Sequence, residues 1–337
     1  MSEQEQSGPQ DHPILPQYKE TKWYDAWIRW EKGSKETYDD DDDADDDEPP
    51  LIPTDTYHST YEVPSMDGGD TMTTISLQLK GFPSESEAIW TSTGLTLWRS
   101  AEFLCSYLVQ HYRKLVPRLQ GDRPSRILEV GSGLGRSGIL IHLLAYVASQ
   151  DEAKDADICR RQRVVLTDGD TDVLAQLRSN VQQNLELNAT LVQNSSDVNC
   201  QESSSDLSCH QLIWGKDHAK AFVQRPCFHS SYRGNNDPDA SYFDVIIGSD
   251  LIYVAQVIEP LFETIQTLLH PNHGIFLMAH CARHEGNEVE LDMVLGQARK
   301  VGLQYTRLHP KEDGKTEDES DPEDGIYLYQ FEWSTKD

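Results

Sequence analysis

The sequence has few apolar residues. Only 37% of its 337 residues are hydrophobic, below the roughly 45–50% of a typical globular chain, a range that also counts glycine. No stretch approaches the roughly 20 apolar residues that cross a bilayer, and residues 1–10 are too polar and acidic for a signal peptide. We therefore expect no membrane association, and we expect part of the chain to remain unpacked.

Basic residues are scarce as well. The chain has 29 Lys and Arg against 57 Asp and Glu, a net charge of −28. Proteins that bind nucleic acid need clustered Lys and Arg to neutralise phosphates, so this balance argues against that class. Residues 39–48 hold nine acidic and no basic residues, and residues 311–324 hold eight acidic residues and two lysines. These two acidic runs carry more than half of the net charge and should stay solvated.

Metal-binding signatures are missing. The six cysteines form no Cys-x-x-Cys pair and show no zinc-site spacing, and the twelve histidines include no His-Glu-x-x-His. The sequence therefore predicts no metal site. It also predicts reduced, intracellular thiols at Cys105, Cys159, Cys200, Cys209, Cys227 and Cys281.

The chain divides into two regions. Residues 1–56 are predicted to be a mostly disordered acidic segment, and residues 57–337 a folded domain. The exception in the first region is a tryptophan-rich motif with Trp23, Trp27 and Trp30. Three indole rings are costly to leave in water, so this motif is expected either to cap the domain or to bind a partner.

The domain has the pattern of an α/β protein. Residues 57–63 and 72–79 alternate around a glycine-containing turn, which predicts a β-hairpin, and residues 99–115 have helical spacing. After them, strands and helices alternate, which indicates a mostly parallel sheet with helices on both faces. The last strand follows without a helix and can be antiparallel. The seven predicted strands are 126–130, 164–167, 211–214, 243–248, 274–280, 303–308 and 326–333, with helices at 136–149, 171–188, 255–269 and 288–301.

Three polar insertions interrupt this plan. Residues 151–163, 194–209 and 225–241 are rich in charged, Ser, Asn and Asp residues and are predicted to be surface loops. The acidic run at 311–324 lies between the last two strands, at the tip of their connection.

A glycine-rich turn joins the first strand of the sheet to its helix. Residues 127–138 read Ile-Leu-Glu-Val-Gly-Ser-Gly-Leu-Gly-Arg-Ser-Gly. Glycines let the backbone turn sharply and approach a ligand closely, and the N–H groups that begin the helix then face that ligand. This position in an α/β sheet predicts a ligand site; a tight turn without a ligand is the alternative.

The ligand is harder to assign. Residues 133–138 match the Gly-x-Gly-x-x-Gly of dinucleotide sites, a weak signal on its own. Glu129 would crowd a pyrophosphate but suits a cation, and Arg136 is the only basic residue nearby. Asp168 ends the next strand, where a carboxylate can bind both hydroxyls of a ribose; Asp170 is its rival. These features favour S-adenosylmethionine, which has a ribose, an adenine and two cationic groups but no phosphate.

Four sequence blocks resemble the seven-β-strand protein methyltransferases of family 16, a largely protein-lysine group. The glycine block alone indicates only some methyltransferase, and the last block, a DxxY after the fourth strand, narrows the resemblance. It extends from about Ser92 to Trp333 and implies a Rossmann-like fold with S-adenosylmethionine as cofactor. The blocks are Gly94-Leu-Thr-Leu-Trp98-Arg-Ser-Ala101, Leu128-Glu-Val-Gly-Ser-Gly-Leu-Gly135, Leu212-Ile-Trp214-Gly215 and Gly248-Ser-Asp250-Leu-Ile-Tyr253.

The resemblance implies where the cofactor lies. Trp98 would contact its methionine end, Trp214 would flank the adenine, and Ser249 would contact it through the backbone. Core packing remains the alternative for both tryptophans. With the residues of the turn and the two acids, the predicted cofactor-binding set is Trp98, Glu129, Gly131, Ser132, Gly133, Gly135, Asp168, Trp214 and Ser249.

Asp250 and Tyr253 are the predicted catalytic residues, and the resemblance places them at the mouth of a channel for the target amine. Methyl transfer needs a neutral nitrogen and good alignment, whereas a free lysine has a pKa of about 10.4. Asp250 would hold the ammonium and receive or relay its proton, and Tyr253 would wall the channel. The alternative roles are a strand-end cap and a packed aromatic. The usual (Asn/Asp)-Pro-Pro-(Tyr/Phe) of nucleobase and glutamine methyltransferases is absent here.

The sequence thus predicts an S-adenosylmethionine-dependent protein N-methyltransferase acting on a lysine of a non-histone protein. It is expected to be a cytoplasmic monomer, with the nucleus as the other compartment. Methylation of a histidine, an arginine or a small molecule stays open, as does a non-catalytic cofactor-binding interaction module. The acidic runs would either steer a Lys-rich substrate or be solvated tails.

Overall fold

The computed structural model describes residues 54–64, 72–83, 92–115, 125–151, 162–194, 206–225, 241–281, 291–309 and 325–334. The tryptophan-rich motif, both acidic runs and most of the three insertions lie outside these ranges. In the described part, no helix is long and apolar enough to cross a membrane.

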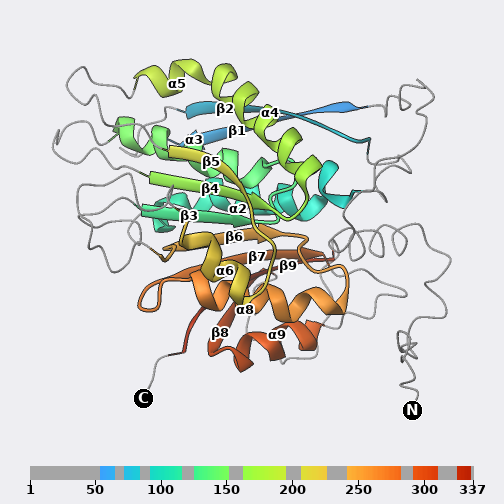
Figure 1. Ribbon diagram of the computed structural model, residues 1–337. Coiled ribbons are helices and arrows are strands. Elements are labelled where there is room, and N and C mark those ends of the chain that lie inside the picture. Colours follow the sequence, from blue (N-terminus) through green and yellow to red (C-terminus); the bar gives the residue numbers. More distant parts are fainter. Residues whose placement is uncertain are drawn as a thin grey trace, which may run out of the picture.

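A seven-stranded sheet forms the centre of the molecule (Figure 1). Its spatial order is β5-β4-β3-β6-β7-β9-β8. Strand β9 runs antiparallel to both of its neighbours, while β5, β4, β3, β6 and β7 pair in parallel. The predicted fold class is therefore confirmed. The strands are β3 (Ser125–Val130), β4 (Gln162–Asp168), β5 (Asp206–Gln211), β6 (Val245–Ser249), β7 (Ile275–Cys281), β8 (Leu303–His309) and β9 (Ile326–Trp333).

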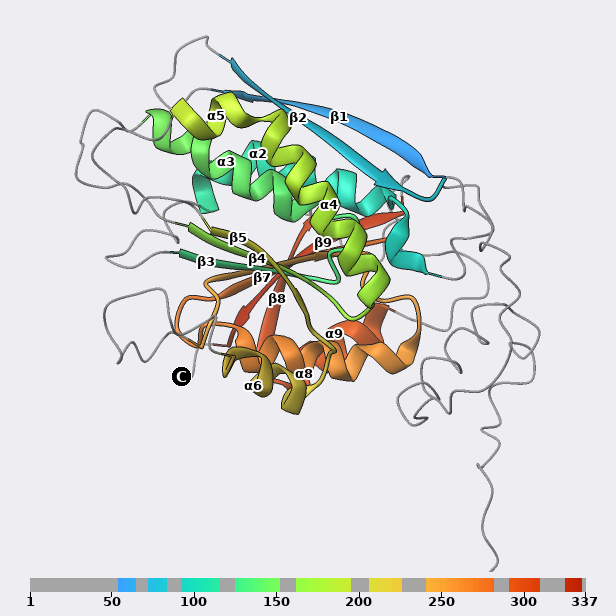
Figure 2. The ribbon, with the colours of Figure 1, turned by 45° about the horizontal axis from the view of Figure 1, so that its top comes forward.

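Helices cover both faces of this sheet, as Figure 2 shows. Strand β3 explains why: Ile127 packs into the core on one face, and Leu128 and Val130 into the core on the other. A strand buried on both faces needs apolar residues on both. The first face carries α2 (Arg99–Leu115), α3 (Arg136–Asp151), α4 (Thr171–Leu187) and α5 (Ala189–Asn194); the second carries α6 (Lys216–Val223), α8 (Ile258–Leu268) and α9 (Leu291–Lys300).

The region around β5 corrects the sequence prediction. The strand is Asp206–Gln211, which begins within the expected loop 194–209 and shares only Gln211 with the predicted strand 211–214. Because β5 is at the edge of the sheet, residues 207–211 are only half-buried and carry no apolar run. Leu212 and Trp214 are apolar because they pack onto the core beyond the end of the strand. The short helices α5 and α6 were also not predicted.

The predicted hairpin is confirmed. Strands β1 (Asp55–Pro64) and β2 (Met72–Gly81) pair antiparallel and lie outside the helices α3 and α4 (Figure 2). Alternate residues of β2, namely Ile75, Leu77 and Leu79, are buried in the core. The hairpin therefore forms a further layer on one side of the domain.

Three asparagines of α4 hold the edge of β2. Asn180 bonds the N–H and C=O of Lys80, Asn184 bonds those of Gln78, and Asn188 donates to the C=O of Ser76. Four residues of helix rise about 6.0 Å and two residues of strand about 6.7 Å, so the two spacings match. We call these three residues the asparagine ladder. They satisfy strand groups that would otherwise be an open edge.

Candidate functional site

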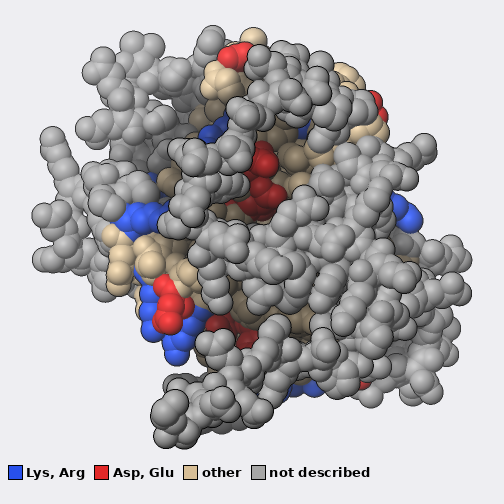
Figure 3. Space-filling model, turned by 45° about the vertical axis from the view of Figure 1, so that its right-hand side comes forward, with Lys and Arg blue, Asp and Glu red and all other residues tan. Residues whose placement is uncertain are grey.

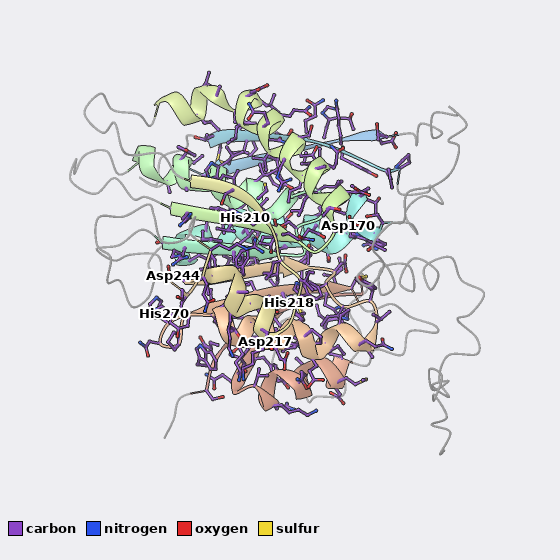
Figure 4. All side chains as sticks on the ribbon, viewed as in Figure 1. Asp170, His210, Asp217, His218, Asp244 and His270 are labelled. Atoms are coloured by element: carbon purple, nitrogen blue, oxygen red, sulfur yellow. The ribbon has the colours of Figure 1, made fainter. Side chains whose placement is uncertain are left out.

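The predicted site residues meet at the carboxyl end of the sheet. From β3 the chain continues to β4 and β5 on one side and then returns to β6 on the other side. The order in which strands are added therefore reverses between β3 and β6. Ligands of α/β sheets bind outside the carboxyl ends at such a switch point. In Figure 4, Asp170 follows β4 at this end, and Asp244 precedes β6 at the opposite end. Figure 3, which turns this end toward the viewer, shows acidic side chains lying deep in the surface.

The glycine turn has a backbone that only glycine adopts easily. Gly131, Gly133 and Gly135 have φ angles of 59°, 51° and 88°, which strain other residues. A Cβ on Gly131 would lie 2.8 Å from Leu251 and 3.3 Å from the Trp214 ring. A Cβ on Gly133 would lie 3.0 Å from the Gly94 carbonyl oxygen. The turn is thus closely surrounded by residues from three of the four sequence blocks.

Ser132 connects the turn to the sheet. Its N–H donates to the Thr167 carbonyl over 2.8 Å, and its Oγ accepts from the Thr167 N–H over 3.0 Å. The side chain is buried and also donates to the Glu129 carbonyl. Through these bonds the Ser132 hydroxyl extends the pairing of β3 with β4. This structural role is separate from any contact that the Ser132 backbone makes with a ligand.

Glu129 is buried behind the turn. Its side chain is 3% exposed, and among the described residues its Oε2 has no hydrogen-bond partner. Burial raises the pKa of this carboxyl from 4.5 to about 8, because a charge is poorly solvated there. A buried acid with an unpartnered oxygen is a group that a nearby cation would stabilise.

The Glu129 carboxyl should make stability depend on pH. The folded protein keeps this proton up to about pH 8, whereas the unfolded chain loses it near 4.5. The stability that it contributes is thus complete below pH 4.5 and is lost as pH rises through 8. We expect Glu129→Gln to flatten the fall in Tm of the ligand-free protein between pH 5 and 8, measured by calorimetry. An unchanged slope would show that Glu129 is ionised in the folded protein.

Asp168 and Asp170 have different surroundings. The Asp168 carboxylate accepts the N–H of Gly133 over 3.1 Å and that of Asp170 over 3.1 Å, so it lies against the turn. Asp170 caps helix α4 by accepting the N–H groups of Asp172 and Val173, a common role for Asp. Asp168 thus lies against the glycine turn, whereas Asp170 is engaged at the start of α4.

The two predicted tryptophans differ in how they approach the turn. Trp214 is half-buried, follows β5 and approaches Gly131. Trp98 is also half-buried and precedes α2; its Nε1 donates to the Thr93 carbonyl over 2.9 Å. Thr93 belongs to the 3₁₀ helix η2 (Thr93–Leu95), whose Gly94 approaches Gly133. The Trp214 ring therefore borders the turn, whereas Trp98 is connected to it through Thr93 and Gly94.

Asp250 has an unusual backbone. Its φ of 50° is the only positive value for a non-glycine residue in the described ranges, and such strained residues cluster at functional sites. Strand β7 holds it there: the Asp250 N–H donates to the Ala279 carbonyl over 3.0 Å, and Cys281 donates its N–H to Asp250 Oδ1 over 3.3 Å. Among the described residues Oδ2 has no partner. Ser249 is half-buried at the end of β6, and Tyr253 is 41% exposed.

Two residues of the site region carry roles that the sequence did not indicate. Arg136 is directed away from the turn: its guanidinium donates to the Tyr61 hydroxyl and to Ser59 Oγ of the hairpin. It is therefore not a phosphate ligand, in line with a phosphate-free cofactor. Asn180 donates to the carbonyl of Leu134, inside the turn. Its only signal in the sequence is the four-residue spacing of three asparagines.

Comparison with known proteins decides the family. The family described as "Lysine methyltransferase" matches residues 84–228 and 233–296, more than half of the chain. The chain belongs to methyltransferase family 16. A family relative, the protein named EEF1A lysine methyltransferase 3 of Xenopus tropicalis, is 25% identical over 190 residues. The match covers 56% of this chain and 59% of that relative, so the chain spans less than two thirds of its length.

Two solved structures that resemble this chain are named methyltransferases. One is SMU.776, a putative methyltransferase complexed with SAH. The match covers 81% of this chain and 55% of that chain, with a TM-score of 0.40 and 11% identity. The CurJ carbon methyltransferase covers 70% and 55%, with a TM-score of 0.38 and 15% identity. Similarity at this level adds nothing about substrate.

Membership of the family supports S-adenosylmethionine as the cofactor of this chain. The residues at the turn fit that cofactor: the glycine cradle leaves no room for a Cβ, Arg136 is committed to the hairpin, and the acidic Glu129 and Asp168 lie at the turn.

Proposed function

We propose that this protein is a protein N-methyltransferase that modifies a lysine side chain of a non-histone protein. The observation that carries the proposal is the strained, tethered Asp250 at the carboxyl end of the sheet, beside the exposed Tyr253. The family description and the name of the Xenopus tropicalis relative support a lysine target.

For the cofactor we propose the following arrangement. Gly131, Ser132, Gly133 and Gly135 form the backbone cradle, with Asp168 at the ribose and Trp214 beside the adenine. Glu129 lies behind the turn, where the positive charge of the cofactor would favour loss of its proton, and Trp98 and the backbone of Ser249 border the methionine end. When bound, the cofactor supplies a methyl group on a positively charged sulfur.

The proposed catalytic work falls to Asp250 and Tyr253. A lysine ammonium has no lone pair, so it must lose a proton before it attacks. Because Cys281 occupies Oδ1, we assign Oδ2 of Asp250 to bind the ammonium and take that proton. A cofactor held in the glycine cradle would supply its methyl group to this nitrogen lone pair, with the sulfur keeping the electrons of the broken sulfur–carbon bond. Tyr253 lines the approach and orients the amine.

The experiment is transfer of labelled methyl from S-adenosylmethionine into protein of a lysate, with wild type beside Asp250→Asn. A discrete labelled band with wild type only, and mass spectrometry that locates the methyl on a lysine Nζ, is the expected result. A methyl on histidine or arginine would contradict the lysine assignment. Label only in small molecules, or cofactor binding without any transfer, would contradict a protein methyltransferase.

Trp214 gives a prediction for the adenine subsite. Trp214→Ala removes a flat apolar wall beside Gly131, so we expect the Kd for S-adenosylhomocysteine to rise about ten-fold. Trp214→Phe keeps an aromatic face and should bind within about three-fold of wild type. Isothermal titration calorimetry measures both. If Trp214→Ala binds as wild type does, the indole is a core residue and not part of the cofactor site.

A further inference from the structure

Asn180 touches both the hairpin and the glycine turn. It is fully buried in the middle of α4. Its Oδ1 accepts the Lys80 N–H over 2.9 Å, and its Nδ2 donates to the Lys80 carbonyl over 3.1 Å and to the Leu134 carbonyl over 3.1 Å. Leu134 lies between Gly133 and Gly135. One side chain thus joins the end of β2 to the backbone of the cofactor turn.

Further contacts join the hairpin to the same turn. A Cβ on Gly81, the last residue of β2, would lie 2.5 Å from Leu134 Cδ1, so the strand packs directly on the Leu134 side chain. On the other side of Gly135, the buried Arg136 donates to the Tyr61 hydroxyl over 2.9 Å and to Ser59 Oγ over 2.7 Å. Both neighbours of Gly135 are therefore held by the hairpin.

Asn184 provides an internal comparison. It is as buried as Asn180 and makes the same pair of bonds to β2, at Gln78. Its remaining donor bond goes to the Asn180 carbonyl within its own helix. The two asparagines therefore hold the hairpin alike, and they differ in that only Asn180 bonds the turn.

We propose that the hairpin is a positioning element for cofactor binding and that Asn180 is the positioning residue through which it acts. Asn180 fixes the Leu134 carbonyl, so that the neighbouring glycines keep their left-handed backbone before the cofactor arrives. Preorganisation of this kind lowers the cost of binding. The inference rests on the glycine turn being the cofactor site, as proposed above.

The test compares Asn180→Ala with Asn184→Ala in the full-length protein. Both changes remove two bonds to β2 and should lower Tm to a similar extent. Titration with S-adenosylhomocysteine, well below both melting temperatures, should show a Kd raised about ten-fold for Asn180→Ala and within about two-fold of wild type for Asn184→Ala. Equal Kd values for the two variants would overturn the proposal, because loosening of the hairpin alone would then explain the change in cofactor affinity.

A milder second arm guards against misfolding of Asn180→Ala. Tyr61→Phe removes only the hydroxyl that Arg136 donates to, and we expect its Kd to rise about three-fold. Wild-type affinity in this variant would also count against the hairpin as a positioning element. Gly131→Ala distinguishes a failure of the assigned cofactor site from a failure of the role given to Asn180. Normal binding of S-adenosylhomocysteine by Gly131→Ala would refute the assigned site. Normal binding by Asn180→Ala alone would refute only the positioning role.

Discussion

Asp250→Asn is expected to lower kcat/KM for the protein substrate by at least about 100-fold, the usual contribution of a positioned acid or base. The amide keeps the shape of the side chain and an acceptor for the Cys281 N–H, but it has neither the charge to bind an ammonium nor the basicity to take its proton. The Kd for S-adenosylhomocysteine should stay within about two-fold. Initial-rate kinetics with the identified substrate and calorimetric titration measure the two quantities.

Asp250→Ala separates charge from backbone strain. Asn tolerates a positive φ better than most residues, so Asp250→Asn should melt close to wild type. Alanine at a φ of 50° costs about 1–2 kcal/mol and should lower Tm by several degrees. Asp217→Asn is a matched control, because its side chain is 97% exposed and pairs only with Lys220 among the described residues. Full transfer by Asp250→Asn would eliminate the proposed role of the carboxylate.

Gly131→Ala is expected to remove most cofactor binding. The new Cβ would lie 2.8 Å from Leu251 Cδ2 and 3.3 Å from the Trp214 ring, and the φ of 59° adds strain. The Trp214 ring must then move out of its place beside the turn. We expect the Kd for S-adenosylhomocysteine to rise roughly 30- to 100-fold, with folding preserved when measured by circular dichroism.

The matched control is Gly296→Ala in helix α9. A Cβ there meets nothing within 4 Å, so the change should leave cofactor affinity unaltered and stabilise the helix by about 0.5–1 kcal/mol. Similar losses of affinity in both variants would mean that the effect comes from general destabilisation. Unaltered affinity in Gly131→Ala would exclude this turn as the cofactor site.

The order of strands and helices could be predicted because it determines the pattern of apolar residues along the chain. A strand such as β3, buried on both faces, has apolar residues on both, Ile127 on one face and Leu128 and Val130 on the other, and the helices that cover it show a 3.6-residue period. The edge strand β5 was misplaced for the same physical reason: without burial on both faces its sequence is free to be polar, with Ser208 and His210. The apolar Leu212 and Trp214 beyond it then gave the stronger but misleading signal.

The interactions of the site residues were less predictable than the identity of those residues. The sequence indicated Asp250, but its left-handed backbone depends on Ala279 and Cys281 of another strand. Ser132 was predicted to bind the cofactor, but the sequence did not indicate that its hydroxyl also bonds the backbone of β3 and β4. Arg136 and Asn180 act across 75 and 46 residues of chain. Spacing along a sequence does not reveal such pairings.

The asparagine ladder also imposes an order of assembly. Lys80 and Asn180 are 100 residues apart, and β3, α3 and β4 lie between them. During synthesis the hairpin emerges first, but the helix that receives it follows only after this whole intervening half. The hairpin can therefore attach only after α4 has formed. Its attachment closes a loop of about 100 residues, and prior folding of the intervening residues shortens the flexible part of that loop and so lowers the entropic cost of closure. A nascent chain that ends before α4 should expose β2 to protease, and one that extends past Asn188 should protect it.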